Sequence, residues 1–425
     1  MTTTSVPVAG ARAADAWIFP EASLEAEFGD LLRLLRLVRP VGRTPSPMNR
    51  QVVLSFQGDK YLSATTWDYE VRRQVHVGTR QPSPIHGFIL PARPLEDAVR
   101  LLAKGKPKTD KVKIQQTMVM GLPKVFVQAD GYSLALGMNC ADAATAGAWF
   151  EEISFREAEG PGRVQATWAA VDLLRLMGSV KHAIGKDDTT PVLCAAQILW
   201  DSGRLRILAT DRYRLARATL GRTSTDSETS GQKFERLLPL KVWNLIAPII
   251  KGEDELRITA SDDAGPLLSI TGENCAIDVL CHNGTYPKIN ELFHGQRVHA
   301  KLSRKELLRA TTILQGMAGP GTPIVLHRVT GGMQAASEGY DGDRSKSPVM
   351  QVSGHEFIDT ALNPHFLQET LAALPGDQLR ISWLVERGPT KPVMVTDGDA
   401  PLGEQETEYL VMPVRMPADP VEKCS

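Results

Sequence analysis

The chain has 425 residues, with 48 lysines and arginines against 49 aspartates and glutamates, so its formal net charge is −1. At roughly 100–200 residues per domain, this length predicts about two to four domains, and the hydrophobic fraction of 42% is enough to build their cores. The balanced charge argues against a basic protein that coats nucleic acid and against an acidic disordered tail. It remains compatible with positive charge gathered on one face.

The terminal and cysteine patterns indicate a cytoplasmic protein. Residues 1–22 are rich in Thr, Ala and Pro and lack a basic stretch followed by an apolar one, so we expect a disordered extension without a signal peptide. No run of 18 apolar residues occurs, so no transmembrane helix is expected. The cysteines never show C-x-x-C spacing, which favours a reducing compartment over a disulfide framework or a zinc site. They are Cys140, Cys194, Cys275, Cys281 and Cys424.

Three sequence markers recur in the same order along the chain. A D/E-L-L-R motif begins at Asp30, Asp172 and Glu306, and each copy opens a stretch with apolar residues at helical spacing. A proline that suits a first helical turn follows in each repeat. A strand-like phrase with alternating apolar residues comes next. These two later markers begin at Pro91, Pro239 and Pro364 and at Asp110, Asp254 and Asp377.

The recurrence predicts three similar α+β domains, each with two helices among many short strands. The repeats are too long for a solenoid, whose units span about 20–50 residues. Turn-rich or polar segments at 141–147, 157–162 and 294–297 suggest the joins, and 222–232 is expected to be a surface loop. The predicted divisions are an extension (1–22), three domains (23–152, 153–297 and 298–417) and a tail (418–425).

Several segments together closely resemble the bacterial sliding clamp family, the beta subunit of DNA polymerase III. Residues 203–216 read G-R-L-R-I-L-A-T-D-R-Y-R-L-A, similar to the family's strand with an ATD–aromatic–RLA element. Residues 409–416, Y-L-V-M-P-V-R-M, resemble its closing MPxRL-like strand. The phrase N-P-H-F-L from Asn363 resembles the family's FNPxYL, and L-P-A-R from Leu90 resembles its counterpart in the first domain. The resemblance runs from about Leu24 to Pro417.

This resemblance implies three sliding-clamp domains, each with antiparallel sheets outside and two helices inside. Two chains are expected to associate head to tail into a ring around duplex DNA, which raises the processivity of the polymerase without catalysis and without a cofactor. The implied partners are duplex DNA of any sequence, the polymerase III alpha subunit, the clamp loader, and other polymerases and repair factors with clamp-binding peptides. The implied location is the cytoplasm, on the nucleoid.

A pocket that binds partner peptides is implied by the same resemblance. Apolar walls from neighbouring domains could bury the Leu or Phe anchors of a peptide. The leucines of this set could instead be ordinary core residues of strands. The expected lining is Leu193, Thr210, Arg212, Tyr213, Leu215, Pro239, Trp243, Asn363, Phe366, Leu410, Met412, Pro413 and Arg415.

Basic side chains on the helices are the candidates for contact with DNA. Sliding needs weak contacts spread over many phosphates, because one deep contact would act as a brake. Arg43 and Arg93 match family positions that look toward DNA, and the other candidates are placed only by their helices, where they could equally form a solvated face. The full set is Arg43, Arg93, Arg100, Lys104, Lys181, Lys186, Arg304 and Lys305.

Departures from the family pattern leave a second function open. Leu362 stands where the family commonly has Phe, Trp243 is bulkier than the usual aliphatic residue, and the chain continues past Met416. The alternative is therefore a specialised second clamp of actinobacterial or phage origin that serves repair, phage replication or tolerance to antibiotics that bind the pocket.

A DNA-acting, metal-dependent enzyme is the competing interpretation from another class. It would use acid pairs such as Asp341 with Asp343 or Asp397 with Asp399. Each pair is separated by glycine and lacks the closing Glu of a calcium loop, so a turn is the better prediction. His355-Glu356 lacks the second histidine of a zinc-protease motif, and no P-loop is present. No metal site or catalytic residue is therefore expected.

Overall fold

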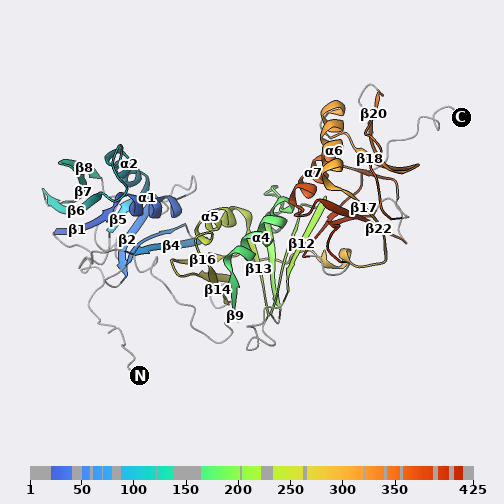
Figure 1. Cartoon of the computed structure of the whole chain (residues 1–425). Helices are drawn as coiled ribbons and strands as arrows, with labels where there is room; N and C mark the ends of the chain where they lie inside the picture. Colours follow the sequence, from blue (N-terminus) through green and yellow to red (C-terminus); the bar gives the residue numbers. More distant parts are fainter. Residues whose placement is uncertain are drawn as a thin grey trace. The chain divides into compact units, whose positions relative to one another are not determined.

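Antiparallel sheets and short helices make up the computed structural model (Figure 1). The strands follow the period-two alternation of their sequences: along Lys111–Val119, Val112, Ile114 and Gln116 are buried between more exposed neighbours. The structure describes residues 21–40, 50–57, 61–68, 70–78, 88–120, 122–136, 164–201, 203–221, 233–261, 266–319, 321–338, 342–354, 358–385, 391–401 and 406–414.

The chain divides into two compact units, the first of which combines residues 1–170 with 241–281. Its four-stranded sheet has the order β1 (Glu21–Glu27), β6 (Lys111–Val119), β7 (Leu122–Ala129), β8 (Tyr132–Leu136). Its eight-stranded sheet has the order β5 (Phe88–Pro91), β2 (Gln51–Gln57), β3 (Tyr61–Trp67), β4 (Val71–Gly78), β16 (Cys275–Leu280), β15 (Leu267–Thr271), β14 (Glu255–Ser261), β9 (Val164–Ala169).

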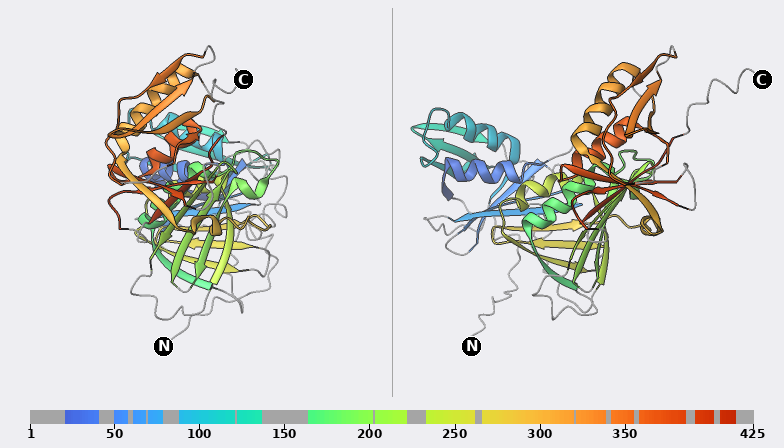
Figure 2. Two further views of the ribbon diagram at one scale, coloured as in Figure 1. Left: turned by 90° about the vertical axis from the view of Figure 1, so that its right-hand side faces the viewer. Right: turned by 45° about the vertical axis from the view of Figure 1, so that its right-hand side comes forward.

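Two helices of this unit, α1 (Phe28–Leu37) and α2 (Ala92–Leu102), lie side by side (Figures 1 and 2). On α1 the buried residues Leu31, Leu34 and Leu35 follow helical spacing, while Arg33 and Arg36 are exposed. Burying each leucine contributes about 1.5–3 kcal/mol, so the apolar stripe fixes which face of the helix is buried. A third helix, α5 (Leu240–Ile250), begins directly after Pro239.

The second unit combines residues 171–240 with 282–425. Its eight-stranded sheet has the order β13 (Lys233–Pro239), β10 (Ala195–Asp201), β11 (Arg204–Thr210), β12 (Arg214–Leu220), β24 (Thr407–Val411), β23 (Val393–Asp397), β22 (Gln378–Leu384), β17 (Arg297–Ser303). Its four-stranded sheet has the order β20 (Arg344–Lys346), β19 (Gly332–Glu338), β18 (Ile324–Val329), β21 (Thr360–Leu362). The helices are α4 (Ala170–Val180), α6 (Arg304–Ala318) and α7 (Pro364–Ala373), with short 3-10 turns η3 (Lys181–Ala183), η4 (Pro191–Cys194) and η5 (Asn290–Phe293).

The same backbone hydrogen bond recurs at the start of three helices. The first residue of α1, α4 and α6 donates its amide hydrogen to the carbonyl of the aspartate that begins the repeated strand phrase, each time at 2.9 Å. These bonds satisfy a helical donor that has no partner inside its own helix. The three pairs are Phe28 with Asp110, Ala170 with Asp254, and Arg304 with Asp377.

The sequence markers therefore occupy equivalent places. The D/E-L-L-R motif begins at the third residue of α1, α4 and α6, and the strand phrase falls on β6, β14 and β22. The prolines stand at or directly before the first residue of α2, α5 and α7, as predicted. The α+β class is confirmed.

Each eight-stranded sheet is two four-stranded sets joined edge to edge. Strand β4 pairs with β16 over five residue pairs, and β12 pairs with β24 over five more. These junctions explain why the compact units divide the predicted second domain, since its two sheet halves are hydrogen-bonded to different neighbours. In the part of the chain that the structure describes, β8 and β20 have a strand neighbour on one side only.

The extension, most of the three proposed joins, the loop 222–232 and the tail lie largely outside the described residues, so the domain limits stay predictions. Among the described helices, none is long and apolar enough to cross a membrane.

Candidate functional site

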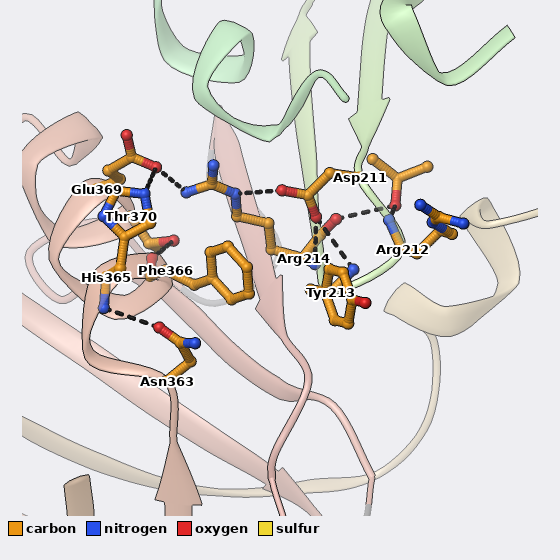
Figure 3. A network of polar contacts seen from close by, with 10 residues as sticks. Asp211, Arg212, Tyr213, Arg214, Asn363, His365, Phe366, Glu369 and Thr370 are labelled. Carbon is orange, nitrogen blue, oxygen red and sulfur yellow. Dashed lines mark hydrogen bonds and ion pairs between the residues drawn. The ribbon is translucent and has the colours of Figure 1, made fainter. Parts of the chain in front are cut away.

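A tight turn between β11 and β12 forms one wall of the candidate site (Figure 3). The carboxylate of Asp211 accepts hydrogen bonds from the amides of Tyr213 and Arg214, both at 3.0 Å. The Thr210 hydroxyl donates to the Arg214 carbonyl at 2.9 Å and accepts from the Arg212 amide at 3.1 Å. These local bonds are typical of Asp and Thr in turns, and they fix the direction of the two exposed side chains, Arg212 and Tyr213.

Arg214 links this turn to helix α7. Its side chain is almost fully buried, donates from Nε to Asp211 at 2.9 Å, and forms an ion pair with Glu369 on α7 (Figure 3). Partial burial would raise the pKa of the Glu369 carboxyl, but the hydrogen bond and charge of Arg214 outweigh it and lower that pKa. A buried guanidinium with two carboxylate partners is thus satisfied inside the unit.

His182 lies behind this ion pair and remains neutral. Its ring packs on Tyr409 with centroids 5.3 Å apart. Burial, assisted by the positive charge of Arg214, lowers the pKa of His182 to about 4. The imidazole therefore adds no charge near neutral pH.

The first turn of α7 forms the opposite wall. Asn363 caps the helix by accepting from the His365 amide at 3.0 Å, and Pro364 occupies the first helical position. Phe366 stacks on Tyr213 with ring centroids 5.5 Å apart and planes 18° from parallel, while the Arg214 guanidinium lies 4.9 Å from the same ring (Figure 3). Two aromatic rings from distant segments thus meet at one place.

An open pocket of about 270 Å³ lies among these elements. Its apolar lining includes Leu193 from η4 and the two stacked rings, and its rim is charged. On the rim, Arg212 donates from Nη2 to Asp187 Oδ2 at 3.0 Å. The full lining is Ile184, Gly185, Lys186, Asp187, Thr190, Leu193, Asp211, Arg212, Tyr213, Arg214, His365 and Phe366. An apolar floor with a few placed polar groups is typical of a binding pocket.

A buried cluster supports the floor of the pocket. Leu193 belongs both to the pocket lining and to this cluster, which also contains Leu215 and Leu410 at 3% and 0% exposure. These two leucines are core residues of β12 and β24, paired in register. They hold the wall from behind and do not line it.

The structure brings together only part of the predicted lining. Leu193, Arg212, Tyr213 and Phe366 line the pocket. Three further predicted residues bond to or adjoin the lining: Thr210 lies in the same turn, Asn363 caps α7, and the Met412 amide donates to the Tyr213 carbonyl at 2.8 Å. Pro413 forms a bridge with Leu362, and Pro239 pairs with Ala195. Trp243 belongs to the first unit, where it is buried, and Arg415 lies outside the described residues.

Eight of the twelve lining residues were not predicted to line a pocket, and Lys186 among them was expected to contact DNA: Ile184, Gly185, Lys186, Asp187, Thr190, Asp211, Arg214 and His365. The i, i+3 spacing of Asp211 and Arg214, inside the very segment that carries the resemblance, was the available signal for one contact. Asp187 and His365 had no local signal, because their role depends on segments far apart in the chain.

The basic residues predicted to contact DNA differ in their surroundings: some are exposed on helices, and others bind to neighbouring groups or line the pocket. Arg93, Arg100, Lys104 and Lys181 are exposed on or just after helices, as expected. Lys186 lines the pocket. Arg304 bonds to the Leu371 carbonyl at 3.2 Å, and Lys305 pairs with Asp377 at 3.0 Å. Arg43 lies outside the described residues.

One cluster on α1 and α2 was also not predicted. Glu96, whose side chain is 5% exposed, accepts from Arg39 Nε at 2.9 Å and from Arg100. Burial would raise the pKa of Glu96, but the two arginines outweigh that effect and lower it. The buried carboxylate of Glu96 thus pairs with two half-exposed guanidiniums, Arg39 just after α1 and Arg100 on α2.

One of the two proposed acid pairs, Asp397 with Asp399, lies in a turn. Asp397 accepts from the Asp399 amide at 2.9 Å, as expected for an Asp-Gly turn. Asp341, His355 and Glu356 lie outside the described residues. Among the described residues no group of three His, Cys, Asp or Glu side chains is arranged to hold a metal ion.

Sequence comparisons converge on one family. Residues 169–288 match the family described as DNA polymerase III beta subunit, central domain. The beta sliding clamp homolog GriR of Streptomyces muensis is 25% identical over 378 residues, which cover 88% of this chain and 93% of that protein. The beta sliding clamp of Streptomyces coelicolor is 24% identical over 385 residues with the same two coverages.

Solved structures share the fold. A sliding clamp from Pseudomonas aeruginosa bound to griselimycin superposes with a TM-score of 0.77, covering 93% of this chain and 100% of that one at 20% identity. The Caulobacter crescentus beta sliding clamp gives 0.77 over 93% of this chain and 99% of that one at 18% identity. These likenesses confirm the predicted fold.

Proposed function

Because the chain belongs to the beta-subunit family of DNA polymerase III, the beta sliding clamps, we propose that it is a processivity factor that encircles duplex DNA and tethers the replicative polymerase to it. Members of this family are non-catalytic, so the proposed work is mechanical. The chain acts on the nucleoid in the cytoplasm.

The matched free edges of β8 and β20 carry this proposal. Within the chain, β4 joins β16 and β12 joins β24, and each junction links the fourth strand of one set to the fourth strand of another. By strand order, β20 is the equivalent of β4 and β12, while β8 is the equivalent of β16 and β24. A second copy supplies the missing neighbour for each edge, which is a head-to-tail interface.

Exposed apolar side chains accompany both edges. Tyr132, the first residue of β8, is 68% exposed, and Ile313 is 55% exposed on α6, which packs on the sheet that ends at β20. Unpaired strand edges with exposed apolar residues favour association with another strand. A homodimer in which each edge meets its counterpart closes the ring.

Basic residues on α1 and α2 support contact with DNA. Arg33, Arg36, Arg93 and Arg100 are exposed on these helices, and Lys104 is exposed just after α2. They present several separate charges, which suits weak, sequence-independent attraction to phosphates. The chain's net charge of −1 shows that this positive charge is local.

The pocket beside Phe366 is the proposed docking site for partner peptides. Its stacked rings and Leu193 offer an apolar floor to a Leu or Phe anchor. The proposed partners are the polymerase III alpha subunit, the clamp loader, and other polymerases and repair factors that carry such a peptide.

Solution mass combined with retention on circular DNA tests the function. We expect a dimer that, once loaded by a clamp loader, stays on nicked circular plasmid and runs off after the plasmid is linearised. Tyr132→Glu and Ile313→Glu should each yield monomers that are not retained, because a charge is placed at the proposed interface. Val171→Glu is the matched control, since Val171 is 67% exposed on α4 and away from both edges in sequence. A wild-type monomer without preference for circles contradicts the proposal.

A specialised second clamp is the other candidate. It is favoured by the Arg212–Asp187 ion pair, which occupies part of the pocket rim and must be displaced or accommodated by any compound that fills the pocket. Griselimycin, found bound to the Pseudomonas aeruginosa clamp, is a suitable probe. Binding about twofold to fivefold weaker than to the Streptomyces coelicolor clamp, restored by Asp187→Asn with Arg212→Gly, supports this candidate; equal binding contradicts it.

A further inference from the structure

The rim of the pocket carries an ion pair whose two members come from different segments. Arg212 stands in the turn between β11 and β12, and Asp187 lies on the segment between η3 and η4. Their side chains meet at 3.0 Å, and both line the pocket. A ligand that enters the pocket would therefore contact this ion pair.

The backbone of Arg212 is unusual for its residue type. Its φ is 80°, in the left-handed region that glycine adopts most easily and that costs other residues about 1–2 kcal/mol. The hydrogen bond from its amide to Thr210 helps to hold this conformation. The turn thus keeps a long cationic side chain at a position where glycine would be the least strained choice, which points to a role for the guanidinium.

The ion pair is easily exchanged. The side chains of Arg212 and Asp187 are 55% and 51% exposed, and exposed pairs of this kind contribute about 0–1 kcal/mol. Asp187 keeps other bonds when the pair opens, because its Oδ1 accepts from the Thr189 amide at 3.1 Å and hydroxyl at 2.7 Å. A carboxylate from a ligand can replace Asp187 on Arg212 without unfolding either segment.

The rim has more positive than negative charge. Lys186 also lines the pocket, and none of the described carboxylates forms an ion pair with it. Across the whole lining the three basic residues Lys186, Arg212 and Arg214 outnumber the two acidic ones, Asp187 and Asp211, and Arg214 and Asp211 pair with each other. Charge complementarity of this kind selects partners more than it raises overall affinity.

We propose that Arg212 is a specificity-determining residue of the pocket: it binds an acidic side chain that stands beside the apolar anchor of a partner peptide, and Asp187 takes the place of that carboxylate when the pocket is empty. The inference rests on the proposed peptide-binding function of the pocket. A neutral ligand can offer Arg212 only an uncharged oxygen acceptor in exchange for the Asp187 carboxylate, so it is disfavoured by comparison. The occupant is thus an apolar peptide with an adjacent acid.

Fluorescence anisotropy with matched peptides tests the proposal. The probes share a Leu-Phe anchor and carry either Asp or Asn at each of the two positions before it. We expect the wild-type chain to bind the better Asp peptide about threefold to tenfold more tightly than its Asn counterpart. The preference should shrink as salt is raised, because both rim charges are exposed.

Three variants separate the role of Arg212 from a general charge effect. Arg212→Gln should abolish the preference, and Arg212→Lys should keep part of it. Asp187→Asn should tighten the Asp peptide severalfold and leave the Asn peptide within about twofold, because a competitor for Arg212 has been removed. Arg204→Ala removes an exposed arginine at the other end of β11 and should change nothing.

The outcomes distinguish this inference from the function on which it rests. If Asp and Asn peptides bind equally, or if Arg212→Gln keeps the preference, the role of Arg212 is overturned while the pocket stands. If no peptide binds the wild-type chain, the proposed pocket itself falls and the inference falls with it.

Discussion

Phe366 and Tyr213 stack with ring centroids 5.5 Å apart, although one lies in the first turn of helix α7 and the other in the turn between β11 and β12. A separate hydrogen bond fixes the backbone near each ring. The Met412 amide donates to the Tyr213 carbonyl at 2.8 Å, and Asn363 caps the helix that carries Phe366. The stacked wall is therefore formed before any ligand arrives, which reduces the entropy that binding must overcome.

Replacing Phe366 with Ala should weaken binding of a Leu-Phe-anchored peptide by at least about tenfold, because a central aromatic contact surface is lost. Isothermal calorimetry on folded protein measures the effect. Val385→Ala is the control, since Val385 is an exposed apolar residue of the same unit that does not line the pocket. An affinity within about twofold of wild type for Phe366→Ala would mean that the peptide binds elsewhere.

Replacing Arg214 with Met should destabilise the protein by about 3 kcal/mol, because Asp211 and Glu369 lose a buried partner. Glu369→Gln should cost only about 1 kcal/mol, since that carboxylate is partly exposed and the amide oxygen still accepts. The double variant should cost less than the sum of the two. Denaturant unfolding measures these values, with Arg204→Met as an exposed control expected to change stability by under about 0.5 kcal/mol. Additive costs would show that the two side chains do not interact.

His182 should make the protein sensitive to mild acid. Its pKa is about 4 in the folded protein and 6.5 in the reference state, so the folded state favours the neutral ring. Stability from this residue is complete above pH 6.5 and is lost as the pH falls from 6.5 towards 4, amounting to about 2 kcal/mol at pH 5. Unfolding free energies at pH 7 and pH 5 check this. His182→Gln should lose less stability over that interval than wild type, and an identical loss in both proteins would refute the assignment.

Glu96 should moderate the attraction between the helices α1 and α2 and DNA. Glu96→Gln removes the charge that neutralises part of Arg39 and Arg100, so binding should tighten and the slope of log affinity against log salt should steepen by about one unit. Asp97→Asn makes the same change of charge at an exposed neighbour outside the cluster. We expect a smaller change there. Equal slopes for wild type and Glu96→Gln would remove Glu96 from DNA binding.

Local features of the fold were predictable from the sequence. The D/E-L-L-R motifs, the helix-starting prolines and the strand phrases each depend on residues close together in the chain, and each is found in equivalent elements. The backbone bonds from Phe28 to Asp110 and from Arg304 to Asp377 explain why the motifs recur, since they join the helix start to the strand start. The alternation of apolar and polar residues predicts a strand but not its neighbours, so it could not predict that β8 and β20 remain without a second strand neighbour once β4 pairs with β16 and β12 with β24.

The pocket was only partly predictable. Tyr213 and Phe366 followed from the family resemblance, but the pairing of Arg214 with Glu369 joins residues 155 positions apart and leaves no local pattern. Basic residues near helices were harder still. Arg304 looked like a DNA contact, yet its guanidinium reaches the Leu371 carbonyl, and Lys186 turns toward the pocket. Helical spacing places a residue on an element but does not say what its side chain meets.

The short length of β20 has a consequence for how a closed ring would come apart. The junctions β4–β16 and β12–β24 lie within one chain and pair over five residues each, whereas β20 has three residues to offer. Separating either internal junction leaves the strands tethered by covalent backbone, so DNA still could not pass. In the proposed dimer, the contact between copies would be the one junction that is both short and not bridged by the chain's own backbone. In the proposed ring, chain connectivity therefore makes the contact between copies the place where the ring would open, without disturbing the fold of either chain.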